Sequence, residues 1–397
     1  MLELKGKYNT AKVFTHNVES GAIGQIIALL DQEFTKDSQI RIMPDTHAGV
    51  GCTIGTTMTI TDKIVPNMVG VDIGCGMLTV KLKNKRIDLP ALDSAIHKYV
   101  PSGFSVRESV HSFADEVDLE QLLCKKAVGI DRAYLSIGTL GGGNHFIEID
   151  KDDDDNLYLV IHTGSRNLGK QVADYYQELA YQHCKAKNIE VQELIAALKA
   201  EGREREIQKQ IKKIRPSEIN RHLSYLEGGA FQDYMHDMKI AQHYADVNRN
   251  AIAKEILKRG KLSEDSRFTT VHNYIDLDEN ILRKGAISAQ NNETVLIPMN
   301  MRDGSLICVG KGNADWNYSA PHGAGRLMSR SQAKQSITLS EFKKSMKGIY
   351  STTIETGTID ESAFAYKPME EIIDNIGETV EIVKIIKPVY NFKATGE

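Results

Sequence analysis

Two histidines stand at the ends of neighbouring strand-like runs within residues 139–166. His145 follows three consecutive glycines and an asparagine and precedes the apolar run 146–149, whereas His162 closes the run 157–161. Consecutive glycines let the backbone turn sharply and approach a ligand closely, which a plain core does not require. A single histidine in such a place is more often structural. Two of them, each beside a glycine-rich turn, favour a functional site.

Three further side chains extend this set. Asp72 and Cys75 share the tight loop Gly-Val-Asp-Ile-Gly-Cys-Gly, which would direct a carboxylate and a thiolate at one ion; a turn aspartate beside a buried free cysteine is an equally acceptable alternative. His272 lies in a third strand-like run, residues 268–276. One carboxylate, one thiolate and three imidazoles suffice for one ion with an open position, or for two ions that share a bridging ligand. Ligand softness alone favours zinc.

His322 has a different setting from the strand histidines. Proline precedes it and Gly-Ala-Gly follows it, so we expect it at the start of a helix, with Arg326 and Arg330 one and two turns further on. The helix dipole and the guanidinium groups would then meet a phosphate. No carboxylate is its neighbour in the sequence, which favours a nucleophile or an acid/base group over a metal ligand. Metal-assisted phosphate chemistry is the leading class, and hydrolysis and transfer both stay open.

The composition indicates a large globular protein with no global positive charge. The 397 residues are 41% hydrophobic, enough for a sizeable core, and the formal net charge of -4 provides no field that would attract polyanions. Nothing in the sequence reads as a signal-peptide core or a membrane-length apolar run, so we expect no membrane partner and a cytoplasmic location. The other four cysteines form no CxxC pair and are expected to be packing residues in a reducing compartment; they are Cys52, Cys124, Cys184 and Cys308.

A long stretch with helical spacing of apolar residues separates two regions of strands and glycine turns. An amphipathic helix is expected at residues 19–32, and helical spacing returns from about 168 to 261. The helices expected in that second stretch are 172–187, 189–213 and 218–259. This pattern predicts a helical layer inserted between strands of one continuing sheet. His236 and His243 would share a helix face there, but no acidic pair frames them, so we expect ordinary surface or core residues.

Short strands resume after the helical text. They are expected at residues 283–288, 294–298 and 305–309. The chain should then end with a helix capped at Thr338, a strand at 349–354, a helix at 368–376 and a final strand pair up to Lys393. The fold class is therefore α/β (α+β), with a central layered β-sheet core and glycine-rich loops around the site. We expect one domain, residues 1–397, that includes the helical insertion.

The motifs, taken together, resemble the RtcB family of RNA ligases. The matching segments run in family order across most of the chain and are Pro-Asp-Thr-His-Ala-Gly from 44, Gly-Val-Asp-Ile-Gly-Cys-Gly-Met from 70, Gly-Thr-Leu-Gly-Gly-Gly-Asn-His-Phe-Ile-Glu from 138, His-Thr-Gly-Ser-Arg from 162, His-Asn from 272, Arg-Lys-Gly-Ala from 283, Ser-Ala-Pro-His-Gly-Ala-Gly-Arg from 319 and Met-Ser-Arg from 328. So many motifs in one order make the resemblance specific.

The resemblance implies an RtcB-type fold and an enzyme that joins an RNA 3′-phosphate, or a 2′,3′-cyclic phosphate after it is opened, to a 5′-hydroxyl. The cofactors would be GTP and two Mn²⁺ ions, the context RNA repair or tRNA splicing, and an activating protein a further partner to consider. Cys75 would bridge the ions, with His145 and His162 on one side and Asp72 and His272 on the other. His322 would carry GMP as a covalent phosphoramidate. Manganese thus replaces the zinc that ligand softness favours.

Further residue roles follow from the same resemblance. Nucleotide contacts are implied for Asn144, Phe146, Glu148, Asn273, Ala324 and Lys393, with Glu148 accepting hydrogen bonds from guanine. Phosphate contacts, to RNA or nucleotide, are implied for Arg166, Arg326 and Arg330. Asp45 matches a position important for guanylylation, and Arg326 is grouped with it and with His322 as catalytic.

Two segments depart from the family pattern. Family members carry Gly-Ser-Met-Gly upstream of the nucleophile, where this chain has Pro-Met-Asn-Met-Arg-Asp-Gly from 298 and Gly-Lys-Gly-Asn from 310. The family also commonly ends in Val-Lys-Gly, for which Lys393 is the equivalent here. These changes fit a divergent paralogue. The alternative functions are a metal-dependent cyclic phosphodiesterase that processes RNA ends without ligation, and a non-catalytic RNA-binding protein.

Overall fold

A seven-stranded antiparallel sheet carries most of the candidate site. In the computed structural model, which describes residues 1–204, 206–207 and 220–394, its strands lie in the order β10, β6, β8, β7, β17, β15, β14. Their bounds are Glu264–Val271 (β10), Gly76–Leu82 (β6), Leu157–Thr163 (β8), Phe146–Lys151 (β7), Val380–Lys393 (β17), Gly304–Gly310 (β15) and Thr294–Asn300 (β14). Strands β8 and β6 are buried almost throughout, as expected for continuous apolar runs covered on both faces. The two strands expected around residues 146–149 and 157–161 are confirmed.

This sheet curls until its two edge strands meet. The backbone N–H of Leu296 in β14 donates a hydrogen bond to Thr270 Oγ1 in β10, at 3.0 Å. The inner face carries an apolar cluster that includes Met77 and Phe146. On the outer face, residues such as Leu159 pack against α2 (Leu89–Tyr99) and α6 (Gly228–Gly260). Because successive strand residues point to opposite faces, every second side chain, such as that of Phe146, points into the space that the curled sheet encloses.

A second, six-stranded sheet forms from the N-terminal segment and the chain after β10. Its order is β1, β2, β3, β4, β12, β11, and only β2 and β3 are parallel. The bounds are Leu2–Lys5 (β1), Thr10–Val13 (β2), Ile40–His47 (β3), Ile54–Thr59 (β4), Ile281–Lys284 (β12) and Asn273–Asp276 (β11). Helix α1 (Ser20–Leu30) packs on it and confirms the helix expected at 19–32.

His272 joins the two sheets. The single strand expected at 268–276 is wrong: β10 ends at Val271 in the seven-stranded sheet, and β11 begins at Asn273 in the six-stranded one. The backbone of His272 explains the break, because its N–H donates to the carbonyl of Cys75 while its own carbonyl accepts from Ala286. One residue therefore connects two layers, and its side chain lies at their junction.

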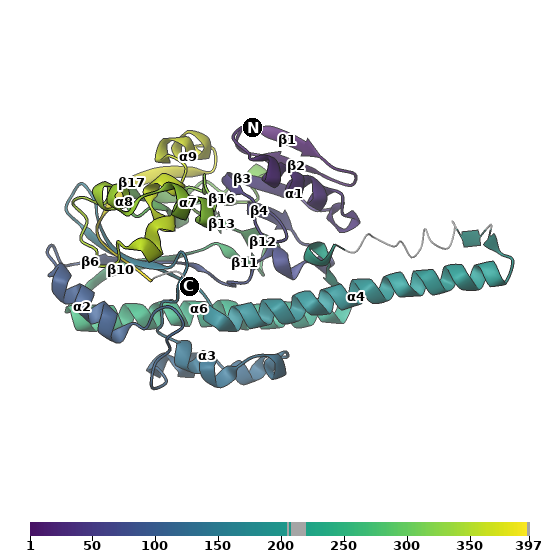
Figure 1. The fold of residues 1–397 in the computed structure, drawn as a ribbon, viewed down its shortest axis with the longest axis horizontal. Coiled ribbons are helices and arrows are strands. Elements are labelled where there is room, and N and C mark those ends of the chain that lie inside the picture. Colours follow the sequence, from purple (N-terminus) through teal and green to yellow (C-terminus); the bar gives the residue numbers. More distant parts are fainter. Residues whose placement is uncertain (205, 208–219, 395–397) are drawn as a thin grey trace.

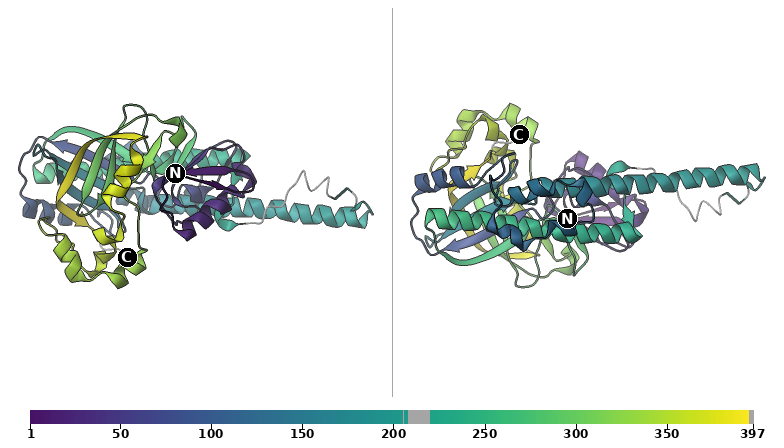
Figure 2. Two further views of the ribbon diagram at one scale, coloured as in Figure 1. Left: turned by 90° about the horizontal axis from the view of Figure 1, so that it is seen from above. Right: turned by 90° about the horizontal axis from the view of Figure 1, so that it is seen from below.

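Two long helices cover the outer face of the sheets (Figure 1). They are α4 (Arg166–Ala200) and α6, and the short α3 (Ile130–Ser136) lies beside α4. Because β8 precedes this layer and β10 follows it within one sheet, the inserted helical layer is confirmed. Helix α4 extends well beyond the body of the molecule in both views of Figure 2. The helix expected at 189–213 is part of α4 up to Ala200, and residues 205 and 208–213 lie outside the described part.

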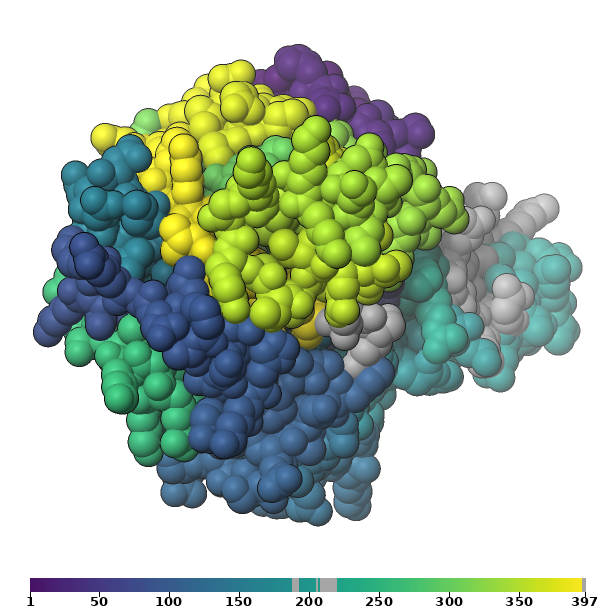
Figure 3. Space-filling view, turned by 60° about the vertical axis from the view of Figure 1, so that its left-hand side comes forward, coloured from purple at the N-terminus to yellow at the C-terminus, as the bar shows by residue number. Residues whose placement is uncertain are grey.

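The C-terminal third of the chain lies on the side of the sheets opposite the long helices α4 and α6. Its helices are α7 (Arg330–Ser336), α8 (Leu339–Ser345) and α9 (Met369–Ile376), and the capping box at Thr338 is confirmed. Figure 3 shows the segment of α7 and α8, in lime, beside the yellow C-terminal segment and above the blue segment around α2 and α3. Two small sheets complete the fold: β13 (Ala286–Ser288) with β16 (Ser319–Pro321), and β5 (Lys63–Ile64) with β9 (Leu226–Glu227). Short 3-10 helices lie at Glu33–Thr35, Pro66–Met68, Ser112–Glu116, Leu119–Gln121, Lys125–Ala127, Arg221–Leu223, Ala314–Trp316, Thr356–Glu361 and Ala363–Ala365.

Three expectations for this C-terminal region are wrong. His322 follows β16 and precedes an irregular turn, and the next helix begins only at Arg330. Residues 349–354 contain no strand, only a single bridge between Tyr350 and Tyr390. The final strand pair is one long strand, β17, whose first half up to Ile386 pairs with β15 and whose second half from Lys387 pairs with β7, with a register shift between Pro388 and Tyr390 inside the second half. The bulge lets a proline interrupt the pattern without ending the strand.

Candidate active site

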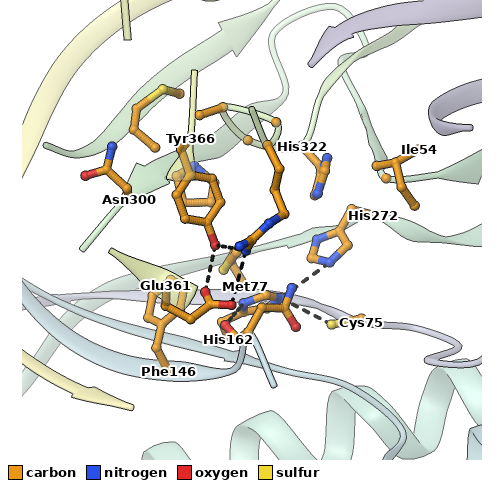
Figure 4. A pocket seen from close by; sticks show the side chains of 18 of the residues that line it. Ile54, Cys75, Met77, Phe146, His162, His272, Asn300, His322, Glu361 and Tyr366 are labelled. Carbon is orange, nitrogen blue, oxygen red and sulfur yellow. Dashed lines mark hydrogen bonds and ion pairs between the residues drawn. The ribbon is translucent and has the colours of Figure 1, made fainter. Parts of the chain in front are cut away.

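A cavity of about 310 Å³ lies where the two sheets and the C-terminal loops meet. It brings together most of the residues selected from the sequence: Asp72, Cys75, Asn144, Phe146, Glu148, His162, His272, Asn273, His322, Ala324, Arg326, Arg330 and Lys393. Figure 4 shows His322, His272 and Cys75 toward one side of this cavity and Phe146, Glu361 and Tyr366 toward the other. His145 and Asp45 contact the lining residues Cys75 and His322, and Arg166 contacts Thr139 at the start of the glycine turn.

Five of these side chains form one contiguous cluster centred on Cys75. Cys75 Sγ lies 3.5 Å from His145 Nε2 and 3.2 Å from His162 Nε2. Asp72 Oδ2 lies 2.8 Å from His145 Nε2, and the Nε2 atoms of His162 and His272 are 3.4 Å apart. The ligand atoms therefore form two overlapping groups, Asp72–Cys75–His145 and Cys75–His162–His272, each within 4.8 Å and sharing the thiol. A shared thiol is what a bridging ligand between two ions requires.

Backbone carbonyls fix the orientation of two of the imidazoles. His145 Nδ1 lies 2.9 Å from the carbonyl oxygen of Leu140, and His162 Nδ1 lies 3.1 Å from that of Asn144. A ring nitrogen that donates to a carbonyl must carry the proton, which leaves Nε2 unprotonated. Both Nε2 atoms point at Cys75, as metal-ligating nitrogens should.

The protonation of the cluster is consistent with a divalent cation. Burial, together with neighbouring imidazoles, holds the pKa values of His162 and His272 well below the ordinary value, which keeps the rings neutral. Burial, with help from the Asp72 carboxylate, raises the pKa of the Cys75 thiol. A buried thiol needs a nearby positive charge to become a thiolate, and a metal ion supplies it. The donor set therefore fits one or two divalent cations.

Helix α6 braces the loops that carry these ligands. Asn248 accepts from the backbone N–H groups of Gly138 and Thr139 and donates to the carbonyls of Thr139 and Gly164. Arg249, which is 1% exposed, donates to the carbonyls of Gly74 and Thr163. Neither residue was predicted from the sequence. Their signal was a polar pair on the apolar face of a helix, which requires buried partners.

His322 is held by a carboxylate from the other end of the chain. Its Nδ1 lies 2.6 Å from Asp45 Oδ2, and its backbone N–H donates to the same oxygen at 3.1 Å. The sequence places no carboxylate beside His322, and Asp45 was not predicted as its partner because 277 residues of sequence separate the pair. Asp45 is fully buried in β3, and Gly325, at φ +74, passes so close to its backbone that a side chain would not fit. With Nδ1 engaged, Nε2 is the ring nitrogen left to react.

The opposite wall offers polar groups suited to a base. Glu148 accepts a hydrogen bond from Asn391 Nδ2 at 2.5 Å, and burial raises its pKa to about 7. Lys393 Nζ lies 5.5 Å from the centre of the Phe146 ring and donates to the carbonyl of Asn144 at 3.3 Å. Asn273 Oδ1 accepts from the backbone N–H of Gly285. Glu148, Phe146 and Lys393 thus line this part of the cavity.

Two of the three arginines expected to bind phosphate, Arg326 and Arg330, are engaged by internal acidic groups. Arg326 contacts Glu361 Oε1 and the carbonyl of Asp360, and Arg330 contacts both of these carboxylates. Arg166 donates to Thr139 Oγ1 and to the carbonyl of Gly103. Asp360 and Glu361 were not predicted as site residues, because two adjacent acidic residues are common in loops.

Residues expected to be unrelated to the site lie away from it. His236 and His243 are exposed on α6, where each ring contacts a backbone carbonyl. The cysteines at 52, 124, 184 and 308 are buried and free. Among the described helices, none combines the length and apolar character needed to span a membrane.

Comparisons with known proteins agree with this arrangement. A family model described as tRNA-splicing ligase RtcB matches residues 32–132 and 125–394. The RNA-splicing ligase RtcB of Escherichia coli strain K12 is 30% identical, over 94% of this chain and 94% of its own length. The tRNA-splicing ligase RtcB of Aeropyrum pernix is 27% identical over 89% of this chain and 86% of its own, and RNA-splicing ligase RtcB2 of E. coli strain ATCC 25922 is 26% identical over 89% and 87%.

Proposed function

The chain belongs to the RtcB family of RNA ligases, and from this premise we propose that it joins an RNA 3′-phosphate, or an opened 2′,3′-cyclic phosphate, to a 5′-hydroxyl at the expense of GTP. The observation that carries the proposal is the pair of Asp45 and His322. A buried carboxylate fixes one ring nitrogen of a cavity-lining histidine at 2.6 Å, beside a cluster of metal-ligand type. This is the geometry of an activated nitrogen nucleophile.

The reaction would proceed in three steps, and His322 would take part in the first two. Its Nε2 attacks the α-phosphate of GTP, a P–N bond forms, the bond from the α-phosphorus to the bridging oxygen breaks, and pyrophosphate leaves. An oxygen of the RNA 3′-phosphate then displaces the histidine, which regains its free lone pair, and GMP is now attached to the RNA end. Finally the 5′-hydroxyl attacks that 3′-phosphate, loses its proton and releases GMP. Asp45 keeps Nδ1 protonated and oriented throughout, so Nε2 stays the reacting atom.

The metal-ligand cluster would hold two manganese ions. Asp72, Cys75, His145, His162 and His272 are the residues to hold them, with Cys75 shared. Bound manganese supplies neutralisation of phosphate charge close to the nucleophile. The tautomers set by the carbonyls of Leu140 and Asn144 present Nε2 of two ligands toward that position.

Base recognition would come from the opposite wall of the cavity. Glu148, when ionised, accepts hydrogen bonds from the N1–H and amino groups of guanine. Phe146 and Ala324 provide apolar surface, Asn144 reaches the phosphates, and Lys393 approaches the base. A pocket built to hydrogen-bond one base rejects others, because its buried polar groups would be left unpaired.

Guanylylation of the protein by GTP tests this proposal. Wild-type protein incubated with manganese and GTP labelled at the α-phosphate should acquire an acid-labile label, and His322→Ala should acquire none. Asp45→Asn should bind as much manganese as wild type but label about 100-fold more slowly, because Nδ1 is no longer held by a charge. Absence of label on wild type, under conditions that load a known ligase, overturns the proposal. Cyclic-end opening without GTP and without joined product would instead identify a phosphodiesterase.

A further inference from the structure

One buried carboxylate contacts three cationic side chains from three different segments. Glu361 Oε1 lies 2.5 Å from Arg330 Nη1 and 3.4 Å from Arg326 Nη1, and its Oε2 lies 2.6 Å from Lys393 Nζ. Tyr366 Oη donates to Oε2 at 2.7 Å and accepts from Arg326 at 3.1 Å. Glu361 ends a 3-10 helix, Arg326 follows the His322 loop, Arg330 begins α7 and Lys393 ends β17.

Burial makes the contacts mutually dependent. The side chains of Glu361 and Lys393 are 3% and 4% exposed. Burial acts against the charge of Glu361, but Lys393, Arg330 and Arg326 outweigh it and hold the pKa of this carboxyl at about 2. Removing one partner from such a network leaves the others as uncompensated buried charges. Among the three cations, Lys393 therefore depends most on the charge of Glu361, because Arg326 and Arg330 also contact Asp360.

Lys393 is the cation that links this network to the base-binding wall. Its Nζ lies between Glu361 Oε2 and the carbonyl of Asn144, and it faces the Phe146 ring. Neither Asn144 nor Phe146 carries a full charge, so Glu361 is the strongest of the three contacts. Without it, the ammonium group would follow solvent or the nucleotide phosphates rather than the base.

We propose that Glu361 is a positioning residue that sets the preference for guanine nucleotides, by holding Lys393 at the base-binding wall and Arg326 near the phosphates. The inference rests on the proposed guanylylation and deepens it. Glu361 touches neither the base nor the reacting phosphorus; it acts through Lys393. Two residues therefore share the control of nucleotide selectivity. Glu148 contacts the base, and Glu361 fixes the position of Lys393.

Asp360 provides a matched control on the same segment. It is as buried as Glu361, but its carboxylate contacts Arg330 and Lys334 and not Lys393. Arg326 contacts the backbone carbonyl of Asp360, which a side-chain substitution leaves in place. Asp360→Asn and Glu361→Gln thus remove the same charge from neighbouring buried positions, and only the second removes the partner of Lys393.

The experiment compares guanylylation with adenylylation in the absence of RNA. Rates of labelling by α-labelled GTP and ATP give a selectivity ratio of kcat/KM for wild type, Glu361→Gln, Asp360→Asn, Lys393→Met and the double variant Glu361→Gln/Lys393→Met. We expect Glu361→Gln to lower the ratio about tenfold or more, and Asp360→Asn to leave it within about twofold of wild type. The double variant should be no less selective than Lys393→Met, because both substitutions interrupt one contact.

Two outcomes overturn the proposal: a Glu361→Gln ratio within about twofold of wild type, or additive losses in the double variant. Tyr366→Phe tests the same network if Glu361→Gln does not fold, since it removes one hydrogen bond to Glu361 and leaves every charge; we expect a loss of about threefold in the ratio. An unchanged ratio in a folded Tyr366→Phe, checked by thermal unfolding, then counts against the proposal. Failure of wild type to label at all rejects the proposed function instead.

Discussion

The cavity has two charged clusters built on opposite principles. The metal-ligand cluster, Asp72, Cys75, His145, His162 and His272, brings together neutral and anionic donors with no cationic side chain among them. The carboxylate cluster, Asp360, Glu361, Arg326, Arg330 and Lys393, contains its own counter-charges in direct contact. The first cluster therefore depends on an added cation to hold a thiolate, whereas the second is organised by the chain itself. The charge state of the metal-ligand cluster is therefore determined by a bound cation, whereas that of the carboxylate cluster is determined by ion pairs within the chain.

The largest expected effect comes from removing the shared ligand of the metal cluster. Cys75→Ala should abolish stoichiometric manganese binding and lower guanylylation on the order of 1,000-fold, because both ligand groups lose their common member. Manganese should raise the unfolding temperature of wild type and leave that of the variant unchanged. Metal content and thermal unfolding with and without manganese measure this.

Cys308→Ala is the matched control, since that thiol is equally buried but packs in an apolar cluster that contains none of the metal-ligand residues. It should lose some stability and keep the response to manganese. A Cys75→Ala protein that still binds two manganese ions would break the comparison.

The second effect concerns two buried glutamates with opposite protonation. Glu361 contacts three cations and has a pKa of about 2, whereas Glu148 accepts a hydrogen bond from the neutral amide of Asn391 and burial raises its pKa to about 7. A protonated Glu148 cannot accept both guanine hydrogen bonds, so KM for GTP should rise about tenfold per pH unit below pH 7. In Glu148→Gln, KM should be high and independent of pH, and steady-state guanylylation from pH 5.5 to 8.5 measures both.

The sign for stability is the reverse of that for GTP binding. The pKa of Glu148 is raised on folding, so its favourable contribution is complete below its unfolded value, about 4.3, and is lost as pH rises through 7. Urea unfolding should therefore show that wild type loses stability, relative to Glu148→Gln, between pH 5 and pH 8. Equal pH dependence in the two proteins would contradict the difference drawn between the glutamates.

The smallest effect is expected at the rim of the carboxylate cluster. Arg330 is 44% exposed, unlike Arg326 at 14%, and we expect it to meet the RNA backbone rather than GTP. Arg330→Ala should weaken RNA binding about threefold to tenfold and reduce its salt dependence, while guanylylation stays near wild type. Titration of a labelled RNA at several salt concentrations tests this, and an equal loss of guanylylation would place Arg330 at the nucleotide instead.

The ligands of the metal cluster were visible in the sequence because each carries a local signal. Glycine turns beside His145, His162 and Cys75 mark close backbone approaches, and the strands around residues 146–149 and 157–161 are continuous apolar runs. What the sequence did not reveal is which distant groups meet. Asp45 reaches His322 across 277 residues, and that pairing depends on how β3 docks against the loop after β16.

The errors have physical causes of the same kind. Gly-Ala-Gly after His322 is compatible with either a helix start or an irregular turn. The turn forms because Gly325 has a positive φ and packs directly against the backbone of Asp45. Pro388 suggests two strands, but a bulge absorbs it within β17. Glu361 gave no local signal, because its role comes from three cations that tertiary packing brings together.

The position of His272 also determines when the site forms during folding. This residue directly follows the last position of β10, which pairs with β6, so its imidazole reaches Cys75 and His162 only after β10 has paired across the long helical layer. Contacts that close such long loops form late, since their entropy must be overcome before they contribute. A chain that holds a divalent cation on the Cys75–His162–His272 group has therefore closed this loop. Metal occupancy would separate mature molecules from stalled folding intermediates without any assay of catalysis.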